Sequence, residues 1–226
     1  MPGVGFDIDH TLVIDNKLER VAFMRLLEIV EARGGRVLGT LDEETGRIDD
    51  LLRAQRAGAF SIAEAVGRFV TQRGLEPSEE YVNAFRAFAM RMVDDFVIPV
   101  PGVHRVLHGL RERGTPVAVL SNGWNPLQVL KAQRVGFEGP VVASADIGTQ
   151  KPSPLAFTAL LSALGTPAEQ TWYVGDDPVS DIGGARGAEI HAVWFDWENK
   201  VYPSDLAPPS HTIHCLEELL QCVPSL

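Results

Sequence analysis

Two patterns of hydrophobic and polar residues divide this chain. Beyond about residue 100, apolar runs of three to five residues alternate with longer stretches in which apolar residues recur at helical spacing. Near-continuous apolar runs are typical of parallel strands buried on both faces, and the longer spacing is typical of amphipathic helices. The alternation predicts an α/β core, a doubly wound parallel sheet of Rossmann-like type. Its predicted strands lie at residues 4–6, 116–120, 140–143, 171–174 and 191–195.

Two helices of this core are predicted in detail. The first runs from Asn125 to Val135, with Asn125 as its N-cap and Pro126 at its first helical position. The second runs from Ser153 to Leu164 and carries an apolar stripe.

Residues 15–98 show helical periodicity and no convincing strand. They carry three apolar stripes, each opposite a polar face. The stripes begin at Leu18, Ile62 and Tyr81. We therefore predict a helical domain, residues 15–98, inserted into a core made of residues 1–14 and 99–226.

Length and charge restrict the class of protein. A chain of 226 residues has room for such a core and its insertion. The net charge of -10 argues against nucleic acid as the main partner, because phosphate backbones need clustered Lys and Arg. No apolar run approaches the roughly 20 residues of a membrane span, and the first strand begins too early for a signal peptide. We expect a cytoplasmic protein that binds no membrane, as a monomer or homodimer.

The two cysteines fit that compartment. Cys215 and Cys222 are seven residues apart, which on a helix is too far for a disulfide. We expect both to be reduced, small buried residues.

The first candidate chemistry lies at the end of the first apolar run. Asp7 and Asp9 are two residues apart, so in a strand they point to the same face and can reach one reacting centre. Two carboxylates at short range repel unless a cation or a proton intervenes. The pair therefore predicts a divalent metal site.

Further polar residues follow the other predicted strands. Because ligands of open α/β sheets bind beyond the carboxyl ends of the strands, we expect these residues to converge. Ser121, Asn122 and their backbone N–H groups suit an anionic oxygen, and Lys151 supplies a local positive charge. The remaining candidates are Asp176, Asp177 and Asp181.

This set of residues favours phosphoryl transfer assisted by Mg²⁺. Magnesium prefers carboxylate oxygens and keeps several waters, so two or three acids suffice. One carboxylate would attack phosphorus and form an aspartyl-phosphate, which water would then hydrolyse. Mg²⁺ and Lys151 would neutralise the charge that develops.

Four motifs in this order resemble the haloacid dehalogenase (HAD) superfamily. The resemblance covers essentially the whole chain, and the joint order is far more specific than any single motif. The matching segments are Asp7-Ile8-Asp9-His10-Thr11, Leu120-Ser121-Asn122-Gly123, Lys151-Pro152 and Gly175-Asp176-Asp177-Pro178-Val179-Ser180-Asp181.

The resemblance implies a role for each position. Asp7 would be the nucleophile and a Mg²⁺ ligand, and Asp9 the general acid and base, which also offers its backbone carbonyl to the metal. Ser121, Asn122 and Lys151 would hold the phosphoryl oxygens. The helical insertion resembles the C1 cap of the family.

The roles of the three acidic residues Asp176, Asp177 and Asp181 stay open. Asp176 is our choice for direct metal ligation. Asp181 would act through water or by orienting Lys151, and Asp177 could replace either of them.

His10 departs from the family pattern, which most often has Gly there. The match needs the backbone at this position more than a side chain, so we expect an effect on packing or substrate contact rather than on chemistry. The dehalogenase branch lacks an acid where this chain has Asp9, which favours a phosphatase.

The sequence therefore predicts a Mg²⁺-dependent phosphatase acting on a small phosphorylated metabolite. A phosphomutase or a 2-haloacid dehalogenase on the same core, and a non-catalytic Mg²⁺- or phosphate-binding module, are the alternatives.

Overall fold

Six parallel strands form the central sheet, in the order β5-β4-β1-β6-β7-β8. The computed structural model describes residues 2–224. Every predicted apolar run forms a strand, which confirms the doubly wound α/β core. The strands are β1 (Gly3–Phe6), β4 (Val117–Ser121), β5 (Val141–Ala143), β6 (Thr171–Gly175), β7 (His191–Phe195) and β8 (His211–Ile213).

The order of the strands places β1 at the switch point of the sheet. The chain builds outward from β1 through β4 to β5 on one side, and through β6, β7 and β8 on the other. Val4 of β1 pairs with Val117 of β4 and with Trp172 of β6. Ligands of such sheets bind beyond the carboxyl ends of the strands at this point.

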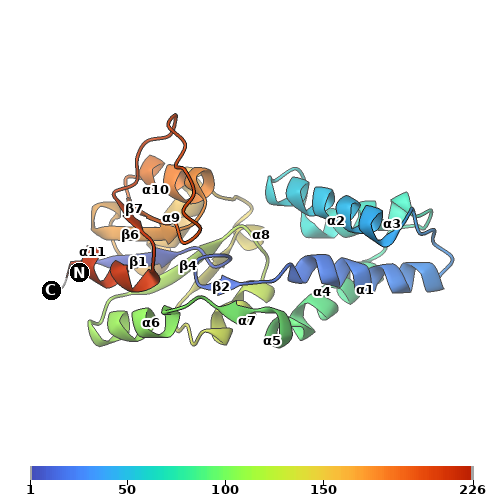
Figure 1. Ribbon diagram of the computed structural model, residues 1–226, viewed down its shortest axis with the longest axis horizontal. Helices are drawn as coiled ribbons and strands as arrows, with labels where there is room; N and C mark the ends of the chain where they lie inside the picture. The colour runs from blue at the N-terminus through green and yellow to red at the C-terminus, as the bar shows by residue number, and fades with distance from the viewer. Residues whose placement is uncertain (1, 225–226) are drawn as a thin grey trace. The chain divides into compact units, whose positions relative to one another are not determined.

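Helices cover both faces of the sheet (Figure 1). α9 (Pro154–Leu164) and α10 (Gly184–Gly187) lie on one face, and α6 (Val103–Glu112) and α7 (Leu127–Arg134) lie on the other. The shorter helical segments are α8 (Ser144–Ile147), η1 (Ala168–Gln170), the π-helical turn η2 (Pro178–Gly183), η3 (Leu216–Glu218) and α11 (Leu219–Cys222).

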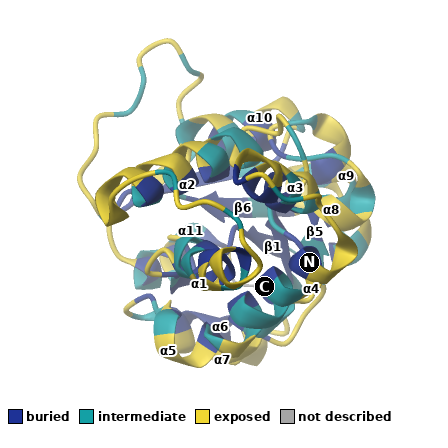
Figure 2. Cartoon of the chain, turned by 90° about the vertical axis from the view of Figure 1, so that its right-hand side faces the viewer, coloured by how far each residue is buried: buried dark blue, intermediate teal, exposed yellow. Residues whose placement is uncertain are grey.

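Buried apolar side chains join α9 to the sheet. Phe157 and Tyr173 meet edge to face, with ring centroids 5.1 Å apart. Leu160 and Leu120 are fully buried in the same cluster. Figure 2 shows β1 and β6 coloured as buried.

Two local predictions were wrong. The helix expected from Asn125 begins at Leu127, with Pro126 at the N-cap, because the Asn125 amide donates instead to Asp146 Oδ2 at 2.7 Å. The cysteines are both free as expected, but Cys215 is exposed and Cys222 is half-buried. The apolar runs also gave no sign of β8 or of the antiparallel pair β2 (Val13–Ile14) and β3 (Ile98–Pro99).

The chain divides into two compact units, Met1–Asp15 with Ile98–Leu226, and Asn16–Val97. The second unit is helical. Its helices are α1 (Leu18–Ala32), α2 (Leu41–Arg56), α3 (Ile62–Gln72), α4 (Glu79–Arg91) and α5 (Val93–Phe96). Among residues 2–224, no helix combines the length and apolar character that a membrane span requires.

The helical unit has its own core. The ring of Phe23 on α1 packs against Phe69 of α3 at 5.1 Å and Phe85 of α4 at 4.5 Å between centroids. Thr40 with Glu43, and Ser61 with Glu64, form capping boxes that satisfy the first backbone N–H groups of α2 and α3.

A buried ion pair links α2 to the end of α3. The guanidinium of Arg73 pairs with the carboxylate of Glu44, and both side chains are 1% exposed. Arg73 Nη1 also donates to Phe69 O at 2.9 Å, and Glu44 Oε1 accepts from the Leu38 N–H. Breaking such a pair leaves a buried charge without its partner, which is more costly than losing an exposed pair.

We predict that Arg73→Ala lowers the free energy of unfolding by about 3–5 kcal/mol, because it strands the Glu44 carboxylate. Chemical denaturation followed by circular dichroism measures this loss. Arg68→Ala is the matched control, since Arg68 is an exposed residue of α3, the helix that ends just before Arg73, and its guanidinium lies over the ring of Phe60. Its cost should be about 1 kcal/mol or less. Equal losses in the two variants would contradict the prediction.

Candidate functional site

Asp7 and Asp9 lie in the tight turn that follows β1. The Asp7 N–H donates to Val174 O at 2.8 Å, which continues the pairing of β1 with β6 by one residue. The Ile8 carbonyl then accepts from three N–H groups, those of residues 11–13. This turn fixes the backbone on both sides of Asp9. It leaves the Asp7 side chain buried and the Asp9 side chain half-buried.

The ammonium of Lys151 lies at the centre of the site. Its Nζ is 2.5 Å from Asp7 Oδ1 and 2.7 Å from Asp181 Oδ1, and it donates to the Tyr173 hydroxyl at 3.0 Å. The Tyr173 hydroxyl in turn donates to Leu120 O at 2.9 Å. The Lys151 side chain is 3% exposed, so these oxygens replace its hydration shell.

The main chain of Lys151 is also fixed. The Asn122 amide donates to Lys151 O at 3.0 Å and accepts from Lys151 N–H at 2.8 Å. Asn122 directly follows β4, so this pair of hydrogen bonds ties the segment before α9 to the carboxyl end of the sheet. The structure therefore engages the Asn122 side chain with Lys151.

Glycine is required where β6 meets η2. A Cβ atom at Gly175 would collide with the Asp181 carboxylate. That carboxylate accepts from the Asp177 N–H through Oδ2 while Oδ1 binds Lys151. Close approach of backbone and side chain here needs a residue without a side chain.

The remaining sequence-predicted residues lie at the same edge of the sheet. The Ser121 hydroxyl, at the end of β4, is buried and accepts from the Gly123 N–H at 3.2 Å. The exposed Asp177 side chain accepts from the N–H groups of Val179 and Ser180, so it caps η2. Asp9 contacts a different lysine, Lys131, at 2.6 Å.

Burial and like charge perturb two of the carboxyl groups. Burial raises the pKa of Asp7 to about 7, with Lys151 opposing the rise and Asp181 and Asp9 adding to it. Burial also raises the pKa of Asp176 to about 8, helped by the charges of Asp181 and Asp7. Burial alone would lower the pKa of the Lys151 ammonium, but Asp181 and Asp7 raise it well above its usual value.

Three carboxylates converge closely enough to share a cation. One oxygen each of Asp7, Asp176 and Asp181 lies within 4.8 Å of the other two. Hard carboxylate oxygens at this spacing fit the preference of Mg²⁺. Burial is the main cause of the raised pKa values of Asp7 and Asp176, and the neighbouring carboxylates add to it. A bound cation would favour the charged form of both groups.

Two residues of this region were missed by sequence reasoning. Tyr173 looks like an ordinary aromatic core residue of a strand, and only its hydroxyl contact with Lys151 distinguishes it. Lys131 looks like a solvated helix lysine, yet its side chain is 1% exposed. The apolar neighbours Leu130 and Ala132 are a weak sequence indication that Lys131 is buried.

The family model of haloacid dehalogenase-like hydrolases matches residues 1–189 of this chain. The chain belongs to the haloacid dehalogenase-like hydrolases. It is therefore an enzyme of the hydrolase class, and the predicted membership of this family is confirmed.

Named relatives of this HAD hydrolase include phosphatases. It is 27% identical over 225 residues to a glyceraldehyde 3-phosphate phosphatase of Pyrococcus furiosus, covering 98% of this chain and 91% of the relative. It is 37% identical over 99 residues to a phosphoserine phosphatase of Thermus thermophilus, covering 42% and 40% of the two chains. Its fold matches that of YfnB, a HAD-hydrolase of Bacillus subtilis solved with bound magnesium. That match has a TM-score of 0.72 at 22% identity and covers 98% of both chains.

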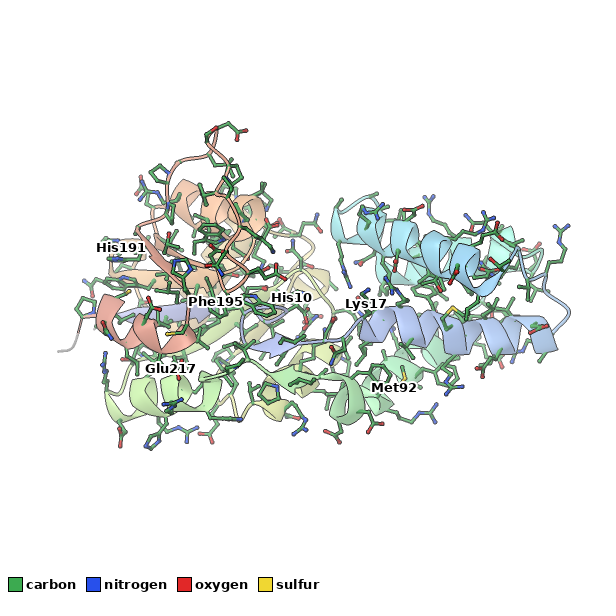
Figure 3. The ribbon with its side chains drawn as sticks, in the orientation of Figure 1. His10, Lys17, Met92, His191, Phe195 and Glu217 are labelled. Carbon is green, nitrogen blue, oxygen red and sulfur yellow. The ribbon has the colours of Figure 1, made fainter. Side chains whose placement is uncertain are left out.

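The structure explains the unusual histidine of this HAD hydrolase. His10 has a φ of 64°, in the left-handed region that favours glycine. Histidine is among the side chains enriched there, and His10 is exposed. Figure 3 labels His10, in the turn after β1, and Phe195, at the carboxyl end of β7, whereas His191 begins β7 at the opposite end.

A pH dependence of stability follows from the raised pKa of Asp176. A carboxyl whose pKa is higher in the folded chain than its usual value of about 4 holds its proton more tightly when folded. Its contribution to stability is complete below pH about 4 and is lost as the pH rises to about 8.

We predict that Asp176→Asn raises the unfolding midpoint at pH 8.5 in EDTA and gives less gain at pH 5, because the amide carries no charge at either pH. Thermal unfolding of both proteins at the two pH values measures the difference. Asp205→Asn, at an exposed loop position, controls for the loss of one surface charge and should show no such pH dependence. The same gain for Asp176→Asn at both pH values would contradict the prediction.

Proposed function

We propose that this HAD hydrolase is a Mg²⁺-dependent phosphatase of a small phosphorylated metabolite, acting through an aspartyl-phosphate on Asp7. One observation carries the proposal: the Asp7 carboxylate is buried against the Lys151 ammonium and shares its surroundings with the carboxylates of Asp176 and Asp181. A carboxylate fixed beside cationic charge suits attack on a phosphorus whose oxygens need neutralisation.

The proposed reaction has two steps. An Asp7 oxygen bonds to phosphorus while the bond from phosphorus to the leaving oxygen breaks, and Asp9 gives that oxygen a proton. Water then attacks phosphorus, Asp9 takes up a proton from it, and the bond between Asp7 and phosphorus breaks. The products are an alcohol and inorganic phosphate.

Ser121 and Lys151 would bind the phosphoryl oxygens in both steps. Lys151 lies against Asp7, and the Ser121 hydroxyl ends the neighbouring strand β4. The backbone N–H of Asn122 is a further candidate donor, since its side chain is engaged with Lys151.

The metal would be held by Asp7 and Asp176, with the backbone carbonyl of Asp9 as a further ligand. Bound Mg²⁺ would neutralise charge on the phosphoryl group. Asp181 suits a supporting role, because Lys151 and the Asp177 N–H already engage its two oxygens.

The helical unit, Asn16–Val97, would serve as a C1-type cap that selects the substrate. The names of the relatives suggest a substrate class, since glyceraldehyde 3-phosphate and phosphoserine are both three-carbon phosphate esters.

The test is phosphate release from a panel of phosphate esters that includes these two compounds, p-nitrophenyl phosphate, sugar phosphates and nucleotides. We expect release with Mg²⁺, none with EDTA, and recovery when Mg²⁺ is restored. Asp7→Asn should lose at least about 10³-fold, because an amide cannot replace the nucleophile.

Asp177→Asn is the matched control, since Asp177 is an exposed neighbour whose side chain only caps η2. It should keep most of the activity. Undiminished turnover by Asp7→Asn would sink the proposal. Halide release from a 2-haloacid, or an isomeric phosphate ester in place of free phosphate, would instead support the dehalogenase or the phosphomutase.

A further inference from the structure

A second buried lysine lies beside the active site. Lys131, in the second turn of α7, has a side chain that is 1% exposed. Its Nζ is 2.6 Å from Asp9 Oδ1 and 3.3 Å from Asp15 Oδ2. All three residues belong to the α/β unit. Lysine is rarely buried to this extent unless its charge is paired, and here two carboxylates pair with it.

The Asp9 side chain depends on such a partner for a fixed position more than the buried Asp7 side chain does. The turn after β1 fixes the backbone around Asp9, but its side chain is 32% exposed and would otherwise be free to change rotamer. The bond to Lys131 selects one position for the carboxylate. Asp15, whose side chain is 9% exposed, holds the ammonium from another side.

We propose that Lys131 is a positioning residue, which holds the Asp9 carboxylate where it can exchange a proton with the leaving oxygen. The inference rests on the proposed phosphatase function, in which Asp9 is the general acid and base. Lys131 itself would touch neither the substrate nor the metal.

The proposal makes the effect of Lys131 depend on the leaving group. In the first step, the bond from phosphorus to the leaving oxygen breaks, and the proton on Asp9 moves to that oxygen. An alkoxide leaves poorly without this proton, whereas p-nitrophenolate is stable enough to leave alone. A misplaced Asp9 therefore slows hydrolysis of an alkyl phosphate far more than that of p-nitrophenyl phosphate.

The experiment measures kcat/KM, which reports the steps up to release of the alcohol, for two substrates of each protein. The substrates are p-nitrophenyl phosphate and the alkyl phosphate that the wild type hydrolyses best. For Lys131→Met we expect a loss of about 10²-fold on the alkyl ester and under about 3-fold on the aryl ester. Asp9→Asn should change the ratio in the same direction. The two values come from one preparation, so the fraction of folded protein cancels from their ratio.

Arg134→Met is the matched control. It removes an exposed basic residue from the same helix, and it should leave both values and their ratio unchanged. If Lys131→Met does not fold, Lys131→Gln, which keeps a polar side chain of similar length, supplies the same ratio.

Equal losses on both esters, or no loss on either, would overturn the inference and leave Lys131 a structural residue. A wild-type enzyme that hydrolyses neither ester would be a different failure, since it would refute the phosphatase function and the inference together.

Discussion

The structure of the site depends on the burial of one ammonium group. An unpaired charge at the position of Lys151 would cost several kcal/mol, so the chain must bring oxygens to it. These come from Asp7 after β1, Tyr173 on β6 and Asp181 on η2, while Asn122 after β4 fixes the lysine backbone. Because β1 lies between β4 and β6, the sheet supplies all of these groups at one edge. The order of the strands is thus what allows the charge of Lys151 to be paired.

The site remains short of positive charge even after this pairing. Asp7, Asp176 and Asp181 surround one ammonium, and burial with mutual repulsion raises the pKa values of Asp7 and Asp176. Replacing a buried ion cluster by apolar residues is often neutral or stabilising, so stability alone does not account for this one. The retained negative charge supports the proposal that a cation completes the site, and the family to which the chain belongs agrees with a hydrolytic function.

The two aspartates of the first motif, Asp7 and Asp9, bind different lysines. Two carboxylates this close in sequence repel, and the sequence suggested that they share one centre. In the structure each has its own lysine: Lys151 binds Asp7 and Lys131 binds Asp9. The β1 strand ends at Phe6, so the turn directs the two side chains to different neighbours rather than to one face of a strand. This division is consistent with different tasks for the two residues, one nucleophilic and one in proton transfer.

The sequence by itself determined the fold class, five of the six core strands that residues 2–224 form, and the apolar stripes of the helices that begin at Leu18, Ile62 and Glu79. Those features are local, because a strand or helix leaves its period in a few consecutive residues and polar groups mark strand ends. Only the tertiary structure decided which lysines are buried, that the Asn122 amide holds Lys151, and that Asn125 turns away from the helix it was expected to cap. The contacts responsible join residues far apart in the chain, 144 positions for Lys151 with Asp7 and 122 for Lys131 with Asp9. A lysine on a helix has the same local sequence pattern whether its charge faces water or a buried carboxylate. Which of the two surrounds it is decided only when the sheet has assembled.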